Sequence, residues 1–181
     1  MLAIWANGWE HAPTTSLTSR QGSSLLFHYY VRGLTDFPSA RPLDMDIHLQ
    51  SFTIPHFPSL MIAMSKPAYL AIVEYSPTKP VVIFVPSRRQ CRLTVDDILT
   101  HCAADDNNDR FLNIEEADLQ PHLDHIMDRS LVETLKHGIG FYHEALDKQD
   151  KRIVERLFQS GAIQVLIASK VFASSLYMLR W

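Results

Sequence analysis

The chain has 181 residues, of which 46% are hydrophobic, and it carries a formal net charge of -3. This length and composition suit one globular domain or slightly more, with a core of useful size. The net charge excludes binding to nucleic acid through overall basicity, so any such binding must depend on a local patch. The sequence shows no signal peptide and no apolar run near the roughly 20 residues of a membrane span, which predicts an intracellular soluble protein with no membrane partner.

The first part of the chain gives few structural signals. Residues 1–40 contain a Ser- and Thr-rich stretch at 12–26 without any period, which predicts loop or disorder, and a short strand is expected at 27–31. Apolar side chains then alternate with polar ones from Leu43 to Leu49, which predicts a half-buried strand. Methionines and alanines between 61 and 75 predict a helix that either kinks at Pro67 or starts near it.

The central and later segments alternate between strand and helix patterns. Residues 81–85 and 163–169 are apolar without alternation, as in parallel strands covered on both faces, and 139–143 predicts a short strand. Helices are expected around 91–102, around 119–126, from a capping box at 130–133 to Gly138, and from the cap Asp147 to Gly161. This order predicts an α/β fold with a doubly wound, mostly parallel sheet and right-handed crossovers.

The two cysteines, Cys91 and Cys102, are eleven residues apart. On a helix this spacing places both on one face but too far apart for a disulfide. Buried thiols in a reducing compartment are therefore expected.

Polar residues follow three of the predicted strands, namely Ser87 and Arg88, His143 and Glu144, and Ser169 and Lys170. In open α/β sheets, ligands bind beyond the carboxyl ends of the strands. Hydroxyls, a histidine and cations there, with a helix N-terminus beginning at Arg88, suit a phosphate chain. A solvated polar rim without a ligand is the alternative that composition leaves open.

Other sites have weaker support. No phosphate-loop, acidic Asp-Glu-x-His box or nucleophile-elbow motif is present. His122 and His125 have a spacing that zinc sites use, but no further ligand cluster accompanies them. The segment 105–116 has acidic or amide residues at several calcium-loop positions, yet Arg110 stands where the sharp turn needs glycine. Surface polar residues are the preferred interpretation of both, and no metal site is predicted.

Several segments in the right order resemble the Ski-type DExH-box RNA helicases: "KPVVIFVPSRRQCRLTVDDILTHCAAD", "LKHGIGFYHEALDKQDKRIVERLF" and "SGAIQVLIAS". The likeness is to the second RecA-like domain of a helicase cassette, and the members that act in pre-mRNA splicing match best. It covers residues 41–170 as a partial RecA-like domain of the helicase C-terminal type. Residues 1–40 and the tail 171–181 are expected to be non-homologous.

The resemblance implies RNA contacts at positions that match family motifs. The residues so implicated are Ser87, Arg88, Arg92, Gly140, His143 and Ser169. Cations there would neutralise phosphates without reading sequence. The implied function is that of an ATP-dependent, nuclear RNA helicase that unwinds small nuclear RNA duplexes with spliceosomal proteins as partners. ATP and magnesium would be cofactors of the intact family protein.

The sequence also departs from the family pattern. Ala145 stands where the family has glycine, and the motif that should continue after Lys170 is not recognisable. The first RecA-like domain, with its phosphate loop, and the later arginine motif are missing from these residues. We therefore expect a fragment that lacks catalytic residues, needs no cofactor of its own and is inactive by itself. The alternative is a non-catalytic α/β binding or scaffold module, which would bind a protein instead of RNA.

Overall fold

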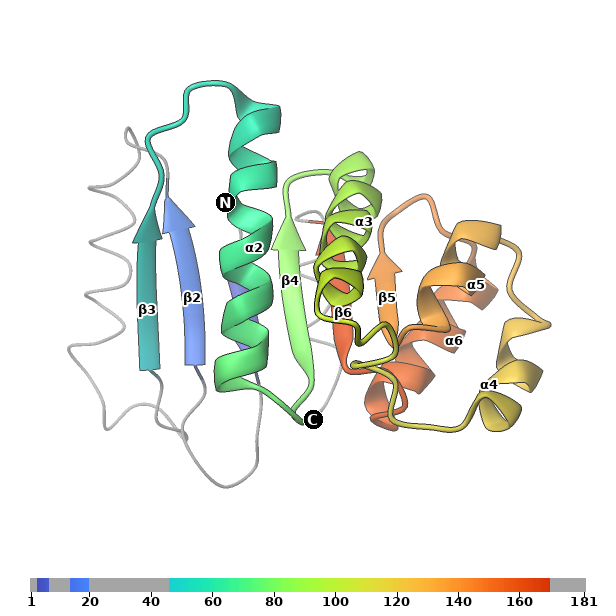
Figure 1. The fold of residues 1–181 in the computed structure, drawn as a ribbon. Coiled ribbons are helices and arrows are strands. Elements are labelled where there is room, and N and C mark those ends of the chain that lie inside the picture. The colour runs from blue at the N-terminus through green and yellow to red at the C-terminus, as the bar shows by residue number, and fades with distance from the viewer. Residues whose placement is uncertain (1–2, 7–13, 20–45, 170–181) are drawn as a thin grey trace, which may run out of the picture.

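A computed structural model describes residues 3–6, 14–19 and 46–169. The strands and helices alternate along the chain from β3 onwards (Figure 1), which confirms the predicted order. The elements are β1 (Ala3–Ala6), β2 (Thr14–Ser19), β3 (Asp46–Ser51), α2 (Phe57–Tyr75), β4 (Val81–Val85), α3 (Arg88–Ala104), α4 (Glu116–Leu123), α5 (Arg129–Leu135), β5 (Ile139–Tyr142), α6 (Lys148–Gln159) and β6 (Val165–Ser169).

The six strands form one mixed sheet in the order β3-β2-β1-β4-β6-β5. Strands β4, β6 and β5 are mutually parallel, as are β2 and β3, whereas β1 runs antiparallel to both of its neighbours. The predicted α/β class with a mostly parallel sheet is therefore confirmed. Within residues 3–6, 14–19 and 46–169, strand β5 lies at the edge of the sheet and pairs only with β6.

Helices cover both faces of the β6–β5 side of the sheet. Helices α2 and α3 lie side by side on one face (Figure 1), and Phe141 points to that face because Arg92 of α3 lies over its ring. The neighbouring residues Gly140 and Tyr142 face the opposite side, where Tyr142 bonds to Glu155 of α6. The core consists mainly of aliphatic and aromatic side chains from β4, β5, β6 and these helices.

Two expectations about buried strands have different outcomes. All five residues of β6 are buried, as predicted. In β4 the burial alternates, because Val82 and Phe84 are only half-buried on the face opposite α3. The prediction that β4 is covered on both faces is thus correct for one face and only partly correct for the other.

The helix boundaries differ from prediction at two places. Helix α2 begins at Phe57 and continues through Pro67, so the alternative of a start near Pro67 is wrong. Helix α5 is capped by Asp128, whose carboxylate accepts the N–H groups of Ser130 and Leu131, so the predicted capping box opening at Ser130 is also wrong. Asp147 caps α6 as predicted, and Gly138 and Gly161 follow helix ends with positive φ.

The loop or disorder predicted at 12–26 is wrong at β2, which lies within this range, and β1 was not predicted. Strand β2 is polar and lacks an apolar period. Its extended conformation therefore depends on pairing with β1 and β3 and not on its own sequence pattern. The predicted strand at 27–31, the residues Leu43 and Met45, and the tail 171–181 lie outside the described residues. The proposed domain limits stay predictions.

Candidate nucleic-acid interface

The carboxyl ends of the three parallel strands lie at one edge of the sheet. Val85 of β4 pairs with Ser169 of β6, and Tyr142 of β5 pairs with Ala168, so the three strands end within about one residue of each other. We call the residues at these ends, Ser87, Arg88, His143, Glu144 and Ser169, the carboxyl ledge. The sequence prediction that these strand ends come together is confirmed.

The part of the carboxyl ledge formed after β4 is exposed. Ser87 has an extended backbone and caps α3, because its hydroxyl accepts the N–H of Gln90 at 3.3 Å. Arg88 and Arg89, in the first turn of α3, are both exposed, and neither forms an ion pair with another residue in the described part of the chain. A helix N-terminus and two exposed guanidinium groups thus attract anions at this point.

The parts formed after β5 and β6 are mostly buried. Ser169 is fully buried, and its hydroxyl donates to Glu144 Oε2 at 3.2 Å. His143 is 4% exposed, and its Nδ1 has no hydrogen-bond partner within residues 3–6, 14–19 and 46–169. Among the predicted contacts, Ser87 and Arg88 are therefore open to a ligand, while His143 and Ser169 are buried.

Charges on the carboxyl ledge influence one another. The backbone N–H of Glu144 and then the hydroxyl of Ser169 lower the pKa of the Glu144 carboxyl, and the charge of Arg88 lowers it further. Burial lowers the pKa of His143, and this is only partly opposed by the negative charge of Glu144. At neutral pH the ledge thus holds the cation of Arg88, the anion of Glu144 and a neutral imidazole.

Two of the predicted RNA contacts have other roles in the structure. Arg92 forms an ion pair of 2.6 Å with Asp128, so its charge is already shared with a carboxylate. Gly140 lies inside β5, and a Cβ at this position would come within 2.9 Å of Ile163 and 3.2 Å of Val154. The structure therefore does not bring Gly140 together with the carboxyl ledge, and close packing against Ile163 and against Val154 of α6 explains the glycine. RNA contact by either residue stays a prediction.

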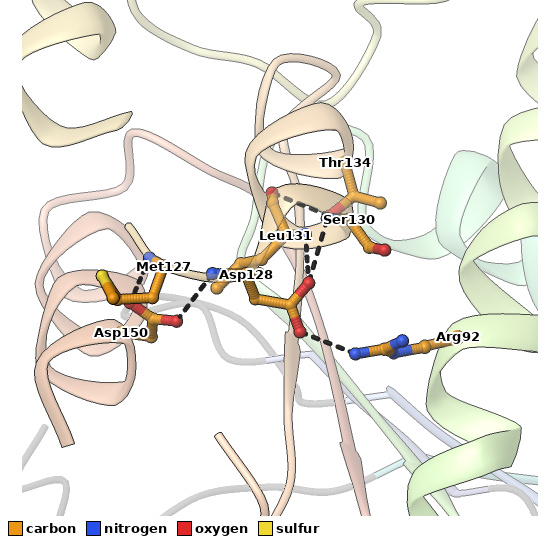
Figure 2. A network of polar contacts seen from close by, with 7 residues as sticks. All are labelled: Arg92, Met127, Asp128, Ser130, Leu131, Thr134 and Asp150. Carbon is orange, nitrogen blue, oxygen red and sulfur yellow. Dashed lines mark hydrogen bonds and ion pairs between the residues drawn. The ribbon is translucent and has the colours of Figure 1, made fainter. Parts of the chain in front are cut away.

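The sequence analysis missed Asp128 and Asp150, which organise the loop before α5. Asp150 is 1% exposed and accepts the N–H groups of Met127 and Asp128, whereas Asp128 accepts from Arg92 (Figure 2). An aspartate two residues before a predicted capping box was a signal for Asp128. No local pattern indicated Asp150, because its partners lie more than twenty residues away.

The described residues offer no metal site. No group of three His, Cys, Asp or Glu side chains in residues 3–6, 14–19 and 46–169 is arranged to hold a metal ion. In the segment 105–116, Asp105 accepts from Tyr69 and Asp109 contacts His137, so these carboxylates do not converge. Within the same residues, no helix is long and apolar enough to cross a membrane.

Comparison with known proteins decides the ancestry of the chain. The human U5 small nuclear ribonucleoprotein 200 kDa helicase is 50% identical over 133 residues, which are 74% of this chain and 6% of that protein. The chain is a homologue of the Ski2-type DExH-box RNA helicases. Further relatives are the Arabidopsis thaliana DExH-box ATP-dependent RNA helicase DExH14, 44% identical over 142 residues, and human activating signal cointegrator 1 complex subunit 3, 40% identical over 142 residues. Those 142 residues are 78% of this chain in both cases, and 7% and 6% of the respective relatives.

This chain thus spans only a small part of the helicases that it matches. No protein-family model matches it. Its parallel strands with flanking helices form part of a RecA-like helicase domain. The name of the Arabidopsis thaliana relative, an ATP-dependent RNA helicase, indicates that the family uses ATP.

Proposed function

We propose that this chain supplies an RNA-backbone contact surface of the second RecA-like domain of an ATP-dependent RNA helicase. The helicase would act on small nuclear RNA duplexes in pre-mRNA splicing, in the nucleus, with spliceosomal proteins as partners. The observation that carries the proposal is the exposed first turn of α3 with Arg88, at the edge where three parallel strands end. The 50% identity to a splicing helicase supports the same function.

The chemistry of this surface is electrostatic. Arg88, Arg89 and the N-terminus of α3 present positive charge, and Ser87 adds a hydroxyl that can donate to a phosphate oxygen. Contacts of this type set the position of RNA without reading its bases. Buried Ser169 supports the surface through its hydrogen bond to Glu144, in the segment that follows β5, and buried His143 belongs to the same segment.

The test is binding of a fluorescent single-stranded RNA to the 181-residue chain, followed by anisotropy at several salt concentrations. We expect Arg88→Ala to weaken binding and to reduce the slope of log K against log salt by about 0.7, the value for one phosphate contact to a single strand. The control is Arg156→Ala. This exposed arginine lies in the last turn of α6, and its replacement should leave the RNA affinity and the salt slope unchanged.

Two results would contradict the proposal. One is an absence of salt-dependent RNA binding by the unmodified chain. The other is an equal response to Arg88→Ala and Arg156→Ala, which would mean that binding is not localised at α3. Binding only to a protein partner would favour a scaffold module instead.

The proposal includes the expectation that this chain does not hydrolyse ATP when alone. Its 181 residues contain neither a phosphate-loop motif nor an acidic helicase box. In helicases of this kind the triphosphate is held between two domains, and the first of them carries both of these elements. Release of phosphate from ATP in the presence of RNA, above that of a protein-free blank, would refute this part of the proposal.

A further inference from the structure

Arg92 makes two contacts that join α3 to other elements. Its Nη2 donates to Asp128 Oδ2 at 2.6 Å, and its guanidinium carbon lies 5.6 Å from the centre of the Phe141 ring in β5. Half of the Arg92 side chain is exposed, whereas only 20% of the Asp128 side chain is. Arg92 lies one helical turn after Arg88, so it fixes the same side of α3 on which Arg88 stands.

Asp128 connects three helices through separate atoms (Figure 2). Its Oδ2 accepts from Arg92 of α3, and its Oδ1 accepts the N–H of Ser130 at 2.9 Å and caps α5. Its own N–H donates to Asp150 of α6 at 3.2 Å. The carboxylate of Asp128 therefore cannot change position without affecting α3 and α5 together.

The network reaches the carboxyl ledge through Phe141. The imidazole of His143 stacks on the Phe141 ring, with centroids 5.6 Å apart and planes inclined by 16°. Strand β5 has only four residues and, in the part of the chain that the structure describes, a single strand partner, so contacts from α3 add to the restraint of its carboxyl end. Arg92 covers the Phe141 ring from α3, which restrains both Phe141 and the stacked His143.

We infer that Arg92 and Asp128 are positioning residues for RNA binding: their ion pair holds the first turns of α3 against the end of β5 and so fixes Arg88 relative to His143. Arg92 acts through Phe141 and Asp128 and does not itself contact the RNA backbone. This inference rests on the proposed function for its effect on RNA. Its structural part concerns the free protein and can be tested separately.

The first experiment uses the free chain, with Asp128→Asn as the main variant. Asparagine is as good a helix cap as aspartate but carries no charge, so the variant weakens the pairing with Arg92 while keeping α5 capped. We expect the amide NMR signals of residues 140–144 to shift and the amides of β5 to exchange hydrogen about tenfold faster. The control is Lys136→Ala, which removes the exposed ion pair between Lys136, at the end of α5, and Glu133. It should leave the amide signals and hydrogen exchange of β5 unchanged.

The second experiment measures RNA affinity and its salt slope for Arg92→Ala and Arg92→Lys. A positioning role predicts a loss of affinity of roughly 3- to 10-fold for both variants with an unchanged salt slope, because lysine lacks the planar group that stacks on Phe141. Combining Arg92→Ala with Asp128→Asn should add little, since both remove the same contact.

The outcomes separate the two proposals. If Arg92→Ala lowers the salt slope by about 0.7 and Arg92→Lys restores it, Arg92 contacts phosphate directly and the inference is wrong. Unchanged β5 signals and exchange in Asp128→Asn would also overturn it, whatever the RNA result. If β5 responds as expected but no variant binds RNA, the proposed function fails while the positioning network stands.

Discussion

The hydroxyl of Ser169 donates a hydrogen bond of 3.2 Å to Glu144 Oε2, which ties the end of the central parallel strand to the segment after the edge strand. The backbone N–H of Glu144 and, to a smaller extent, this bond lower the pKa of the carboxyl, so Glu144 stays charged at neutral pH. An exposed anion thus lies within the field of Arg88, on the surface proposed to meet phosphates.

Removing the negative charge of Glu144 should strengthen RNA binding. Glu144→Gln keeps the size and the acceptor of the side chain but removes a repulsion, so we expect RNA to bind roughly two- to fivefold more tightly at low salt. Glu116→Gln removes an exposed carboxylate from α4, away from the strand ends, and serves as the control. Weaker or unchanged binding in Glu144→Gln would show that phosphates do not approach this edge.

The parallel half of the sheet could be predicted from the sequence because its signals are local. Strand β6 is an unbroken apolar run that is buried throughout, and Asp147 and Gly161 mark the two ends of the preceding helix. Because neighbouring parallel strands have their carboxyl ends at the same edge of the sheet, the polar residues just after them lie at that edge. The positions of Ser87, His143 and Ser169 at one edge followed from this rule alone.

The features that prediction missed depend on partners that are distant in sequence. Strand β2 is polar, and only its pairing with β1 and β3 makes it a strand. The choice of Asp128 over Ser130 as the cap of α5 reflects its ion pair with Arg92 and the hold of Asp150 on its backbone. The burial of Ser169 also depends on neighbouring strands, so its residue type alone suggested more exposure than it has.

Two glycines with the same backbone angle provide a matched test of packing. Gly138 and Gly161 both have a φ of +76°. A Cβ added at Gly138 would lie 2.0 Å from backbone atoms of Phe111, whereas a Cβ added at Gly161 would meet no atom within 4 Å. We expect Gly161→Ala to lower the free energy of unfolding by about 1 kcal/mol, the cost of the left-handed conformation. Gly138→Ala should lower it by about 3 kcal/mol or more, because backbone must also move. Urea denaturation measures both, and equal losses would show that the contact with Phe111 is not close.

The burial of His143 predicts how stability depends on pH. Its pKa is lowered in the folded state, first by burial and also by the charges of Arg92 and Arg88, so the unfolded chain binds a proton more readily. This contribution is fully present above the unfolded pKa, and it is lost as the pH falls below about 6.5 toward the folded pKa. We expect His143→Phe to reduce the loss of stability between pH 7 and pH 5, as measured by urea midpoints. A loss in His143→Phe equal to that of the unmodified chain would contradict the burial of this imidazole.

Both cysteines of α3, Cys91 and Cys102, are fully buried. We therefore expect their thiols to react only when the protein unfolds locally or globally. Burial raises the pKa of Cys91 to about 12 and that of Cys102 to about 11, so almost no thiolate is present at pH 8. An aromatic disulfide reagent should therefore detect no fast thiol in the native protein and two per chain in denaturant. As a control, Thr53→Cys at an exposed position should add one fast thiol. Rapid reaction of the unmodified native chain would mean that α3 does not pack on the sheet as described.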